Sequence, residues 1–322
     1  MKRKYLLFIL VTIFSISMAT HCLAADKIYL RIGTSRIAGS YQLWGSTWAK
    51  VISDKVEEVS AGIEATAGPA ANIKLIEKGI NSLGFASVVA AHEGWNGIGW
   101  ADGTKYQQQR SVFAMYPSYL QLITLKKNNL GTLSDLEGKK VDVGGIGTTP
   151  ALSMQYVKET LGVNYIMSHN DTKVALAALK QGAIDVFARV TGLPNASIMD
   201  LAIGHEIYIV GFKDDELNKL ISKYPYFGTS IIPKNVYKKQ DYEVNTISVW
   251  AIALCDKDLS EDIVYGITKA AFENQDTFIK THPDGKYLIP ENVKYLNIPL
   301  HPGALRYYEE VGQEVPGKLI IK

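Results

Sequence analysis

One order of elements occurs twice along the chain: strand, Gly/Thr-rich loop, helix, strand, helix, glycine, strand. The first occurrence runs from "KIYLRIGT" (27–34) to "SLGFASVVAA" (82–91), and the second from "GKKVDVGG" (138–145) to "AIDVFARVTG" (183–192). Strands that alternate with amphipathic helices are typical of an α/β fold. Because the two copies share little sequence identity, they predict two similar lobes that face each other rather than a tandem array.

The lobes require connecting strands. The segment "VFAMYPSYLQLITLKK" (112–127) is apolar, rich in β-forming residues and placed between the two copies, so it predicts a crossing. A return crossing is expected within 225–255. The resulting domain prediction is lobe 1 at 26–119, lobe 2 at 120–228, and a return crossover with completion of lobe 1 at 229–322.

Residues 1–25 have the pattern of a cleavable secretory signal peptide. Basic residues at 2–4 precede the apolar run 5–18, and Ala24 or Ala25 offers a small-residue cleavage site. The apolar run is shorter than the roughly 20 residues that span a membrane. A lipidated Cys22 is the alternative to its removal with the peptide. We therefore expect a periplasmic protein.

Charge and cysteine content exclude several classes of partner and site. The chain has 34 basic and 32 acidic residues, and loss of three basic signal-peptide residues changes the net charge from +2 to −1. A near-neutral protein without a basic run is a poor ligand for nucleic acid or anionic membranes. Cys255 then remains alone, in an apolar run that predicts core packing.

Each copy places a polar, Gly-containing loop before a helix, at 34–41 and 145–149. In an open α/β sheet, ligands bind at the carboxyl ends of the strands, where helix N-termini offer free N–H groups and a dipole that favours anions. Neither loop has the glycine and lysine spacing of a nucleotide-binding loop. Two facing loops therefore predict a clamp for a small anion, with tight turns as the purely structural alternative.

Ten residues near the predicted strand ends are candidates for ligand binding. Arginine suits carboxylates, but Arg36 could equally be a solvated charge, and Arg189 could form an ion pair within its lobe, for example with Asp185. Asn72 could cap a short helix or turn its amide to a ligand, and the cap is favoured. The candidates are Ser35, Arg36, Ser40, Tyr41, Asn72, Ser87, Gly147, Thr148, Thr149 and Arg189.

No catalytic, cofactor or metal motif stands out in the sequence. The histidines after the signal peptide show no metal-ligand spacing, and no nucleophile elbow is present. His282 and His301 lie in turn-like contexts, "THPDG" and "PLHPGA", and we expect them to stabilise those turns. The sequence thus favours binding over catalysis and predicts no cofactor and no metal.

Six blocks, in order, resemble the TAXI-type solute receptors of TRAP (tripartite ATP-independent periplasmic) transporters. The resemblance covers residues 28–312. The blocks are "IGTSRIAGSYQLWG", "TAGPAANIKLIEKGINSLGFAS", "TLSDLEGKKVDVGGIGTTP", "LKQGAIDVFARVTGLPNASIMDLA", "EDIVYGITKAAFEN" and "IPLHPGALRYYEEVG".

This resemblance implies a two-lobed, type II periplasmic-binding-protein fold, in which each lobe is a mixed sheet flanked by helices and crossover strands join the lobes. It also implies capture of a small organic anion (a carboxylate, dicarboxylate or amino acid) between the lobes and delivery to a cation-coupled TRAP permease. The chain departs from the family in carrying Arg36 in its first loop and Ser118 where the family commonly has an acid. The two arginines suggest a dicarboxylate. The alternatives are a sensory ligand-binding protein and an exported enzyme on the same fold.

Overall fold

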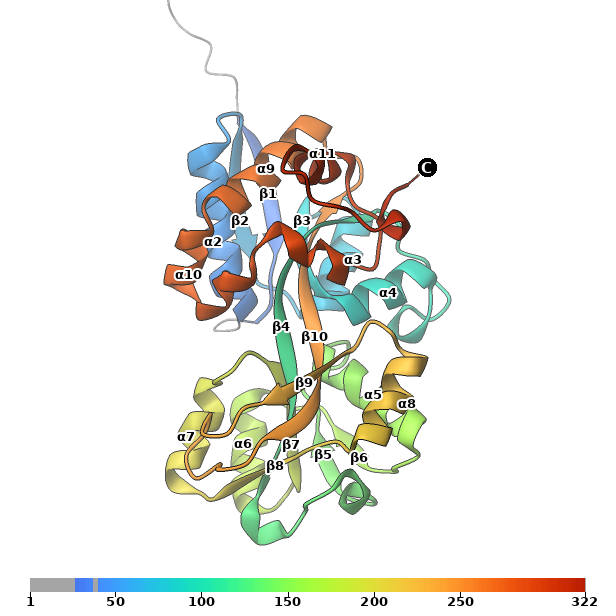
Figure 1. Cartoon of the computed structure of the whole chain (residues 1–322), viewed down its shortest axis with the longest axis vertical. Coiled ribbons are helices and arrows are strands. Elements are labelled where there is room, and N and C mark those ends of the chain that lie inside the picture. The colour runs from blue at the N-terminus through green and yellow to red at the C-terminus, as the bar shows by residue number, and fades with distance from the viewer. Residues whose placement is uncertain (1–26, 37–39, 322) are drawn as a thin grey trace, which may run out of the picture.

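The computed structural model describes residues 27–36 and 40–321 and shows two bodies joined by two long strands (Figure 1). The predicted signal peptide, including Cys22, lies outside the described residues. Ten strands form one continuous sheet that runs through both bodies, with helices on its faces. The fold is therefore the predicted two-lobed α/β architecture, in which crossover strands join the mixed sheets of the two lobes into one.

Lobe 1 is built around three parallel strands in the order β2-β1-β3, with Ile28 opposite Val59 at the start of the β1–β2 pairing. The chain returns to this lobe at its end, where α9 and α10 lie beside α2 and α11 packs against α9 (Figure 1). Its strands and helices are β1 (Ile28–Gly33), α2 (Ser40–Lys55), β2 (Val59–Glu64), α3 (Pro69–Glu77), β3 (Leu83–Ser87), α4 (Val88–Asn96), α9 (Glu261–Glu273), α10 (Gln275–Thr281) and α11 (Pro302–Glu310).

Lobe 2 repeats the plan with three parallel strands in the order β7-β5-β6. Pro150 lies in the first turn of α5, where its missing N–H is tolerated, and Gly182 ends α6 with a φ of 76°, a left-handed conformation that favours glycine. The elements are β5 (Lys140–Asp142), α5 (Thr149–Leu161), β6 (Ile166–Ser168), α6 (Thr172–Gln181), β7 (Val186–Thr191), α7 (Ala196–Gly204), β8 (Ile207–Val210), α8 (Asp214–Lys223) and β9 (Gly228–Ile232).

The crossing strands are β4 (Gln109–Leu125) and β10 (Val244–Asp256), which pair antiparallel over 109–119 and 248–256. In lobe 2, β4 pairs with β7 and β8, and β10 pairs with β9. The register of the β4–β10 pair shifts twice, next to Ala251 and next to Ala253, and such irregularities increase strand twist. Both predicted crossings thus contain a strand that joins the lobes. The exact domain boundaries stay a prediction.

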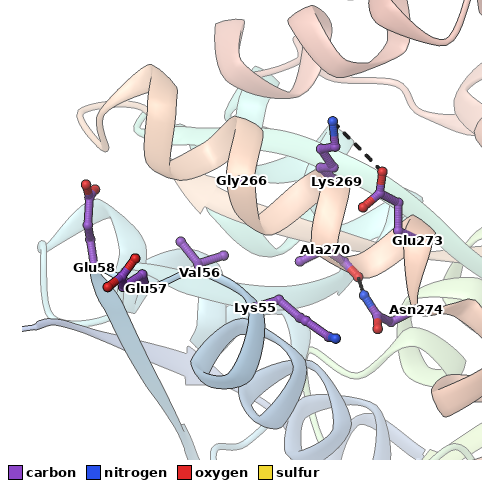
Figure 2. A pocket seen from close by; sticks show the side chains of 9 residues that line it. All are labelled: Lys55, Val56, Glu57, Glu58, Gly266, Lys269, Ala270, Glu273 and Asn274. Atoms are coloured by element: carbon purple, nitrogen blue, oxygen red, sulfur yellow. Dashed lines mark hydrogen bonds and ion pairs between the residues drawn. The ribbon is translucent and has the colours of Figure 1, made fainter.

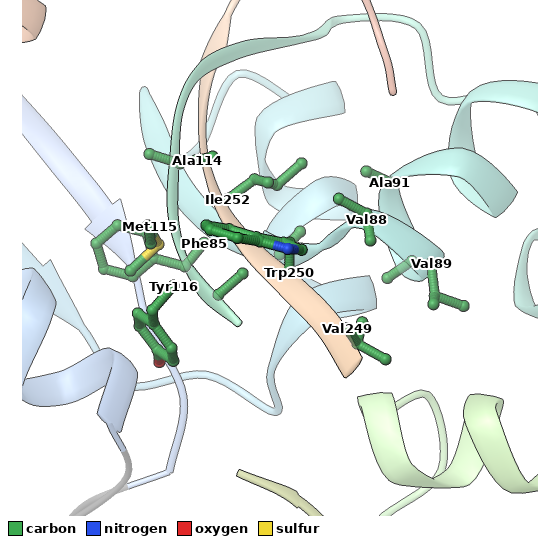
Figure 3. Packing of buried hydrophobic residues seen from close by; sticks show 14 of the residues in the cluster. Phe85, Val88, Val89, Ala91, Ala114, Met115, Tyr116, Val249, Trp250 and Ile252 are labelled. Carbon is green, nitrogen blue, oxygen red and sulfur yellow. The ribbon is translucent and has the colours of Figure 1, made fainter. Parts of the chain in front are cut away.

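Apolar side chains bury the crossing where it enters lobe 1 (Figure 3). Met115 and Ile252 are fully buried, and the Trp250 ring stacks on Tyr295 with ring centroids 4.1 Å apart. Cys255 is also fully buried in β10, so its prediction as a core residue is confirmed. The sheet is therefore anchored in a dry core on the lobe 1 side of the crossing.

One predicted element boundary differs from the structure. The strand expected over 82–91 ends at Ser87, and Val88 begins α4 because the Ser87 hydroxyl accepts a hydrogen bond from the Ala90 N–H at 3.2 Å. An apolar run of this kind does not by itself distinguish a buried strand from a buried helix.

No helix within 27–36 and 40–321 is long and apolar enough to cross a membrane.

Candidate functional site

The carboxyl ends of the parallel strands in the two lobes lead into loops that meet between the lobes. We call the ends of β1 and β2 with the start of α3 the first mouth, and the loops after β5 and β6 the second mouth. A Cβ built on Gly147, in the second mouth, would lie 3.3 Å from the Cβ of Ala70 in the first turn of α3. This short distance between Gly147 and Ala70 shows that the two mouths face each other.

A single buried asparagine holds the first mouth together. The amide nitrogen of Asn72 donates to the carbonyl oxygens of Thr34 and Phe85, both at 2.7 Å. Its amide oxygen accepts from the Thr66 hydroxyl at 2.7 Å. Asn72 is fully buried and is the fourth residue of α3, whose N-cap is Gly68. The expectation of a capping role was therefore wrong, because Asn72 links the loops that follow β1 and β2 to β3.

A buried aspartate has the same role in the second mouth. One carboxylate oxygen of Asp142 accepts from the Gly144 N–H and from Arg189 Nη2, and the other accepts from the Ser168 hydroxyl and from two N–H groups of Asn170. The Asp142 side chain has no exposed surface. Burial by itself raises the pKa of Asp142, but the hydrogen bonds from Asn170 and Arg189 outweigh it and hold the pKa below its usual value.

The guanidinium of Arg189 is already bound by groups of lobe 2 that lie in or beside the second mouth. Its Nη2 lies 2.9 Å from Asp142 Oδ1, its Nη1 donates to the Ala188 carbonyl at 2.7 Å, and its plane lies 4.0 Å from the centre of the Phe187 ring. Only 13% of the Arg189 side chain is exposed. An ion pair within the lobe was the alternative that the sequence left open for Arg189, and the partner is Asp142 rather than Asp185.

Arg36 reaches from the first mouth to the second. Its guanidinium forms an ion pair with Asp171, the residue that precedes α6, and a Cβ built on Gly145 would lie 3.3 Å from Arg36 Nη2. Both side chains of this pair are more than half exposed. Exposed ion pairs contribute little to stability, about 0–1 kcal/mol. The Arg36–Asp171 pair therefore marks where the lobes approach without fixing them strongly.

A second contact between the lobes is buried. The Tyr156 hydroxyl on α5 donates to Glu93 Oε1 on α4 at 2.6 Å, and Glu93 Oε2 accepts from the Trp100 N–H at 3.0 Å. Glu93 is fully buried and Tyr156 is 8% exposed. Burial raises the pKa of Glu93, and the bond from Tyr156 opposes that rise. This bond joins the lobes on the side formed by α4 and α5.

We expect Tyr156→Phe to weaken this joint. The substitution leaves a buried carboxylate oxygen without its donor, which costs about 1–3 kcal/mol. The measurements are the free energy of unfolding in urea and the radius of gyration by small-angle X-ray scattering, which should increase as the lobes separate. Tyr224→Phe is the control, because its hydroxyl is exposed and lies 3.5 Å from Glu159. Equal behaviour of both variants would contradict a role for the Glu93 bond.

Hollows on the outer faces of the lobes offer little to an anion. One lies in lobe 1 between the end of α2 and α9, where Lys55 and Lys269 stand among three glutamates (Figure 2). Lys269 is paired with Glu310 at 2.8 Å. Two further hollows lie on lobe 2, one beside β8 and one at the end of β4. No cluster of three or more potential metal ligands occurs in the described part of the chain.

The sequence profile of the NMT1-like family matches residues 32–312, which include both mouths and both crossing strands. The chain belongs to this family. Its fold is similar to solved structures that share little sequence with it. The aliphatic sulphonate-binding protein SsuA from Escherichia coli is 14% identical, with a TM-score of 0.51 over 88% of this chain and 84% of that one.

A second structural neighbour of this NMT1-like protein is the alkanesulfonate-binding protein SsuA from Xanthomonas axonopodis pv. citri, bound to MOPS. It is 11% identical, with a TM-score of 0.51 over 90% of this chain and 81% of that one. At such low identity the likeness shows the fold, that of periplasmic solute-binding proteins, and not the ligand.

The sequence-predicted candidates occupy both mouths of this NMT1-like protein, but several side chains are already engaged. The Ser87 hydroxyl caps α4, and the Thr148 hydroxyl donates to the Gly145 carbonyl at 2.6 Å. The Tyr41 ring packs on Phe85 with centroids 5.5 Å apart, and burial raises the Tyr41 pKa. Residues that are half-buried at the loop–helix junctions are Ser35, Ser40, Gly147 and Thr149. Whether these residues bind a ligand stays a prediction.

Sequence reasoning missed the residues that organise the mouths and join the lobes. Asp142 and Glu93 carried no recognisable motif, although an acid at the end of an apolar strand and one within an apolar helix were available signals. Buried charges are found only with partners, so each acid called for a partner that the sequence does not identify. His282 and His301 do stabilise turns, as predicted, since each ring accepts an N–H two residues later at 3.2 Å.

Proposed function

We propose that this protein is an extracytoplasmic solute receptor that captures a small organic anion between its two mouths and delivers it to a membrane permease. The observation that carries the proposal is the direct approach of the first turn of α3, at Ala70, to the loop before α5, at Gly147. First-turn N–H groups have no acceptor within their helix, and the helix dipole adds positive potential. An anion between the mouths would satisfy amides from both lobes at once.

Binding rather than catalysis is favoured by how the polar side chains are used. Asn72 and Asp142 form their hydrogen bonds with groups of their own lobes. Such groups hold the loops in place, which preorganises a binding site at low entropic cost. They do not resemble an acid–base pair poised on a substrate.

The ligand class follows from charge as well. A dicarboxylate was suggested by Arg36 and Arg189, yet both guanidinium groups have an acidic partner, Asp171 and Asp142. Support for a doubly charged anion is therefore weaker than the arginine count implied. We propose a ligand with one carboxylate or similar anionic group held by the mouths, with a dicarboxylate as an alternative that the binding experiments include.

The permease partner is proposed to be of the TRAP type, on the strength of the sequence resemblance across 28–312. Uptake in sealed vesicles that contain the membrane subunits tests this partner. An imposed sodium gradient without ATP should drive uptake if the permease is cation-coupled. A requirement for ATP would reject the TRAP assignment and leave the receptor role intact.

Ala70→Asp should abolish anion binding while the protein stays folded. The new carboxylate enters the first turn of α3, where the helix dipole stabilises it, but it repels an anion between the mouths. The parent protein with a ligand at 100 times its Kd gains about 2.7 kcal/mol. At about 2–4 °C per kcal/mol, this gain should raise the Tm by several degrees.

Ala70→Asn is the matched control, because it has nearly the same size as aspartate and no charge. We expect the control to retain part of the thermal shift and the aspartate variant to lose all of it, measured against a panel of carboxylates, sulfonates and amino acids. If no compound shifts the parent Tm, or if Ala70→Asp binds as the parent does, an anion site between the mouths is rejected.

A further inference from the structure

Asp284 is a buried carboxylate without a full set of partners, located where the lobes meet beside the crossing strands. It follows α10 in a short 3₁₀ helix, Pro283–Tyr287, and is 8% exposed. Its Oδ2 atom is inaccessible to solvent and has no hydrogen-bond partner among the described residues. Because a buried, unsatisfied carboxylate destabilises the fold, such a group calls for a functional explanation.

The free oxygen of Asp284 lies at the end of the lobe 2 strand β7. A Cβ built on Gly192, one residue after that strand, would lie 2.5 Å from Asp284 Oδ2. Only glycine leaves room for the carboxylate there. This short distance places an acid from the C-terminal part of lobe 1 over a strand end of lobe 2.

The neighbours of Asp284 do not neutralise it. His282 Nδ1 lies 3.5 Å from Asp284 Oδ2, but this nitrogen accepts a hydrogen bond from the Asp284 N–H, so it presents a lone pair rather than a proton. Lys286 lies on the same turn and is exposed. Burial therefore prevails and raises the pKa of Asp284, while the charge of His282 in its protonated form and the charge of Lys286 oppose the rise only in part.

Aromatic residues of the crossing strand β4 lie near the same place. The Tyr116 ring stacks on His282 with centroids 5.9 Å apart, and Tyr119 follows on the same crossing strand. The negative charge of Asp284 contributes to raising the pKa of both tyrosines, after the larger effect of burial. A buried carboxylate beside the stacked His282 and Tyr116 rings is an environment that attracts a cationic nitrogen.

We propose that Asp284 is a specificity-determining residue that binds an ammonium group of the ligand, so that the receptor selects a zwitterion over an anion of the same shape. This inference rests on the proposed function, since the mouths hold the anionic group and Asp284 takes the cationic one. An ammonium group supplies three donors and the positive charge that the buried oxygen lacks.

Isothermal titration with matched pairs of acids tests the proposal. The pairs differ only in the ammonium group: L-alanine and propionate, L-leucine and 4-methylpentanoate, L-glutamate and glutarate. We expect at least one amino acid to bind about 30-fold or more tightly than its partner, as charge pairs of this kind do. Asp284→Asn, which keeps the shape and removes the charge, should abolish that ratio by weakening the amino acid alone.

The outcomes separate the inference from the proposed function. If a deaminated acid binds as tightly as its amino acid, or if Asp284→Asn leaves the ratio unchanged, the ammonium role is overturned while an anion receptor stands. If no member of the panel binds, the inference is overturned, and the wider screen with Ala70→Asp then decides the proposed function. Asp284→Ser is a second variant, smaller than asparagine, that should give the same loss of selectivity. Retained selectivity in it would also reject the role.

Discussion

Asp142→Ala should lower the free energy of unfolding by about 3–5 kcal/mol, because it leaves the guanidinium of Arg189 buried without its counter-ion. The substitution also removes the acceptor that holds Gly144, Ser168 and Asn170 in the second mouth. Urea unfolding monitored by tryptophan fluorescence measures the loss. Ligand binding should be lost with it, because Asp142 bonds to the loop that follows β5 and to the loop that follows β6 and so fixes both.

The control for Asp142→Ala is the double variant with Arg189→Met, which removes the stranded charge. We expect this double variant to regain part of the lost stability, since two apolar groups can replace a buried ion pair at small cost. If the two substitutions lowered the free energy of unfolding additively, the result would contradict an interaction between Asp142 and Arg189. Asp142→Asn should be intermediate, because it keeps one acceptor oxygen.

The same aspartate gives the stability a defined pH dependence. The folded-state pKa of Asp142 lies below its unfolded value of about 3.9. Its contribution is therefore fully present above the unfolded pKa and is lost as the pH falls through the folded one. The parent should lose stability more steeply than Asp142→Asn below about pH 4, and parallel curves would indicate that Asp142 is not stabilised as an anion.

Asn72→Ala should destabilise the protein by about 2–4 kcal/mol, from the loss of three hydrogen bonds and the exposure of their partners to an apolar cavity. The partners are the carbonyls of Thr34 and Phe85 and the hydroxyl of Thr66. Because these groups belong to loops or strands that end at the first mouth, we also expect weaker ligand binding.

The control for Asn72→Ala is Asn96→Ala, which removes an exposed asparagine that bonds to the His92 carbonyl at 2.9 Å. Surface substitutions of this kind change stability by about 0.5 kcal/mol or less. Urea unfolding of both variants, with the thermal shift for any ligand of the parent, separates the two positions. Equal, small effects would show that Asn72 is not needed to hold the first mouth.

These two predictions describe one design used twice. In each lobe a single buried polar side chain, Asn72 or Asp142, bonds to segments from three strands and fixes the loops at their ends. Because such a loop is already ordered, ligand binding does not lose the conformational entropy of ordering its amides. The two side chains differ in charge, and the negatively charged one, Asp142, requires Arg189 as its counter-ion.

Local sequence patterns predicted the fold correctly because they record which side of each element is buried. Trp44 and Trp48 lie on the buried face of α2, and Gly182 ends α6 at the glycine that follows the second helix in the repeated order. Patterns failed where a local rule allowed two answers. Val88 follows a strand within an apolar run, and only the hydroxyl of Ser87 decides that a helix begins there.

The order of strands, loops and helices, and therefore the two-lobed α/β architecture, is determined by the sequence itself, since periodicity and turn residues act within a few positions of one another. Only the tertiary structure decides which polar groups meet. Arg189 lies 47 residues from Asp142, Tyr156 lies 63 from Glu93, and Asp284 reaches Gly192 only across the two lobes. Hydrogen-bond partners depend on which strand ends become neighbours in space, and that neighbourhood is a property of the assembled sheet rather than of any segment.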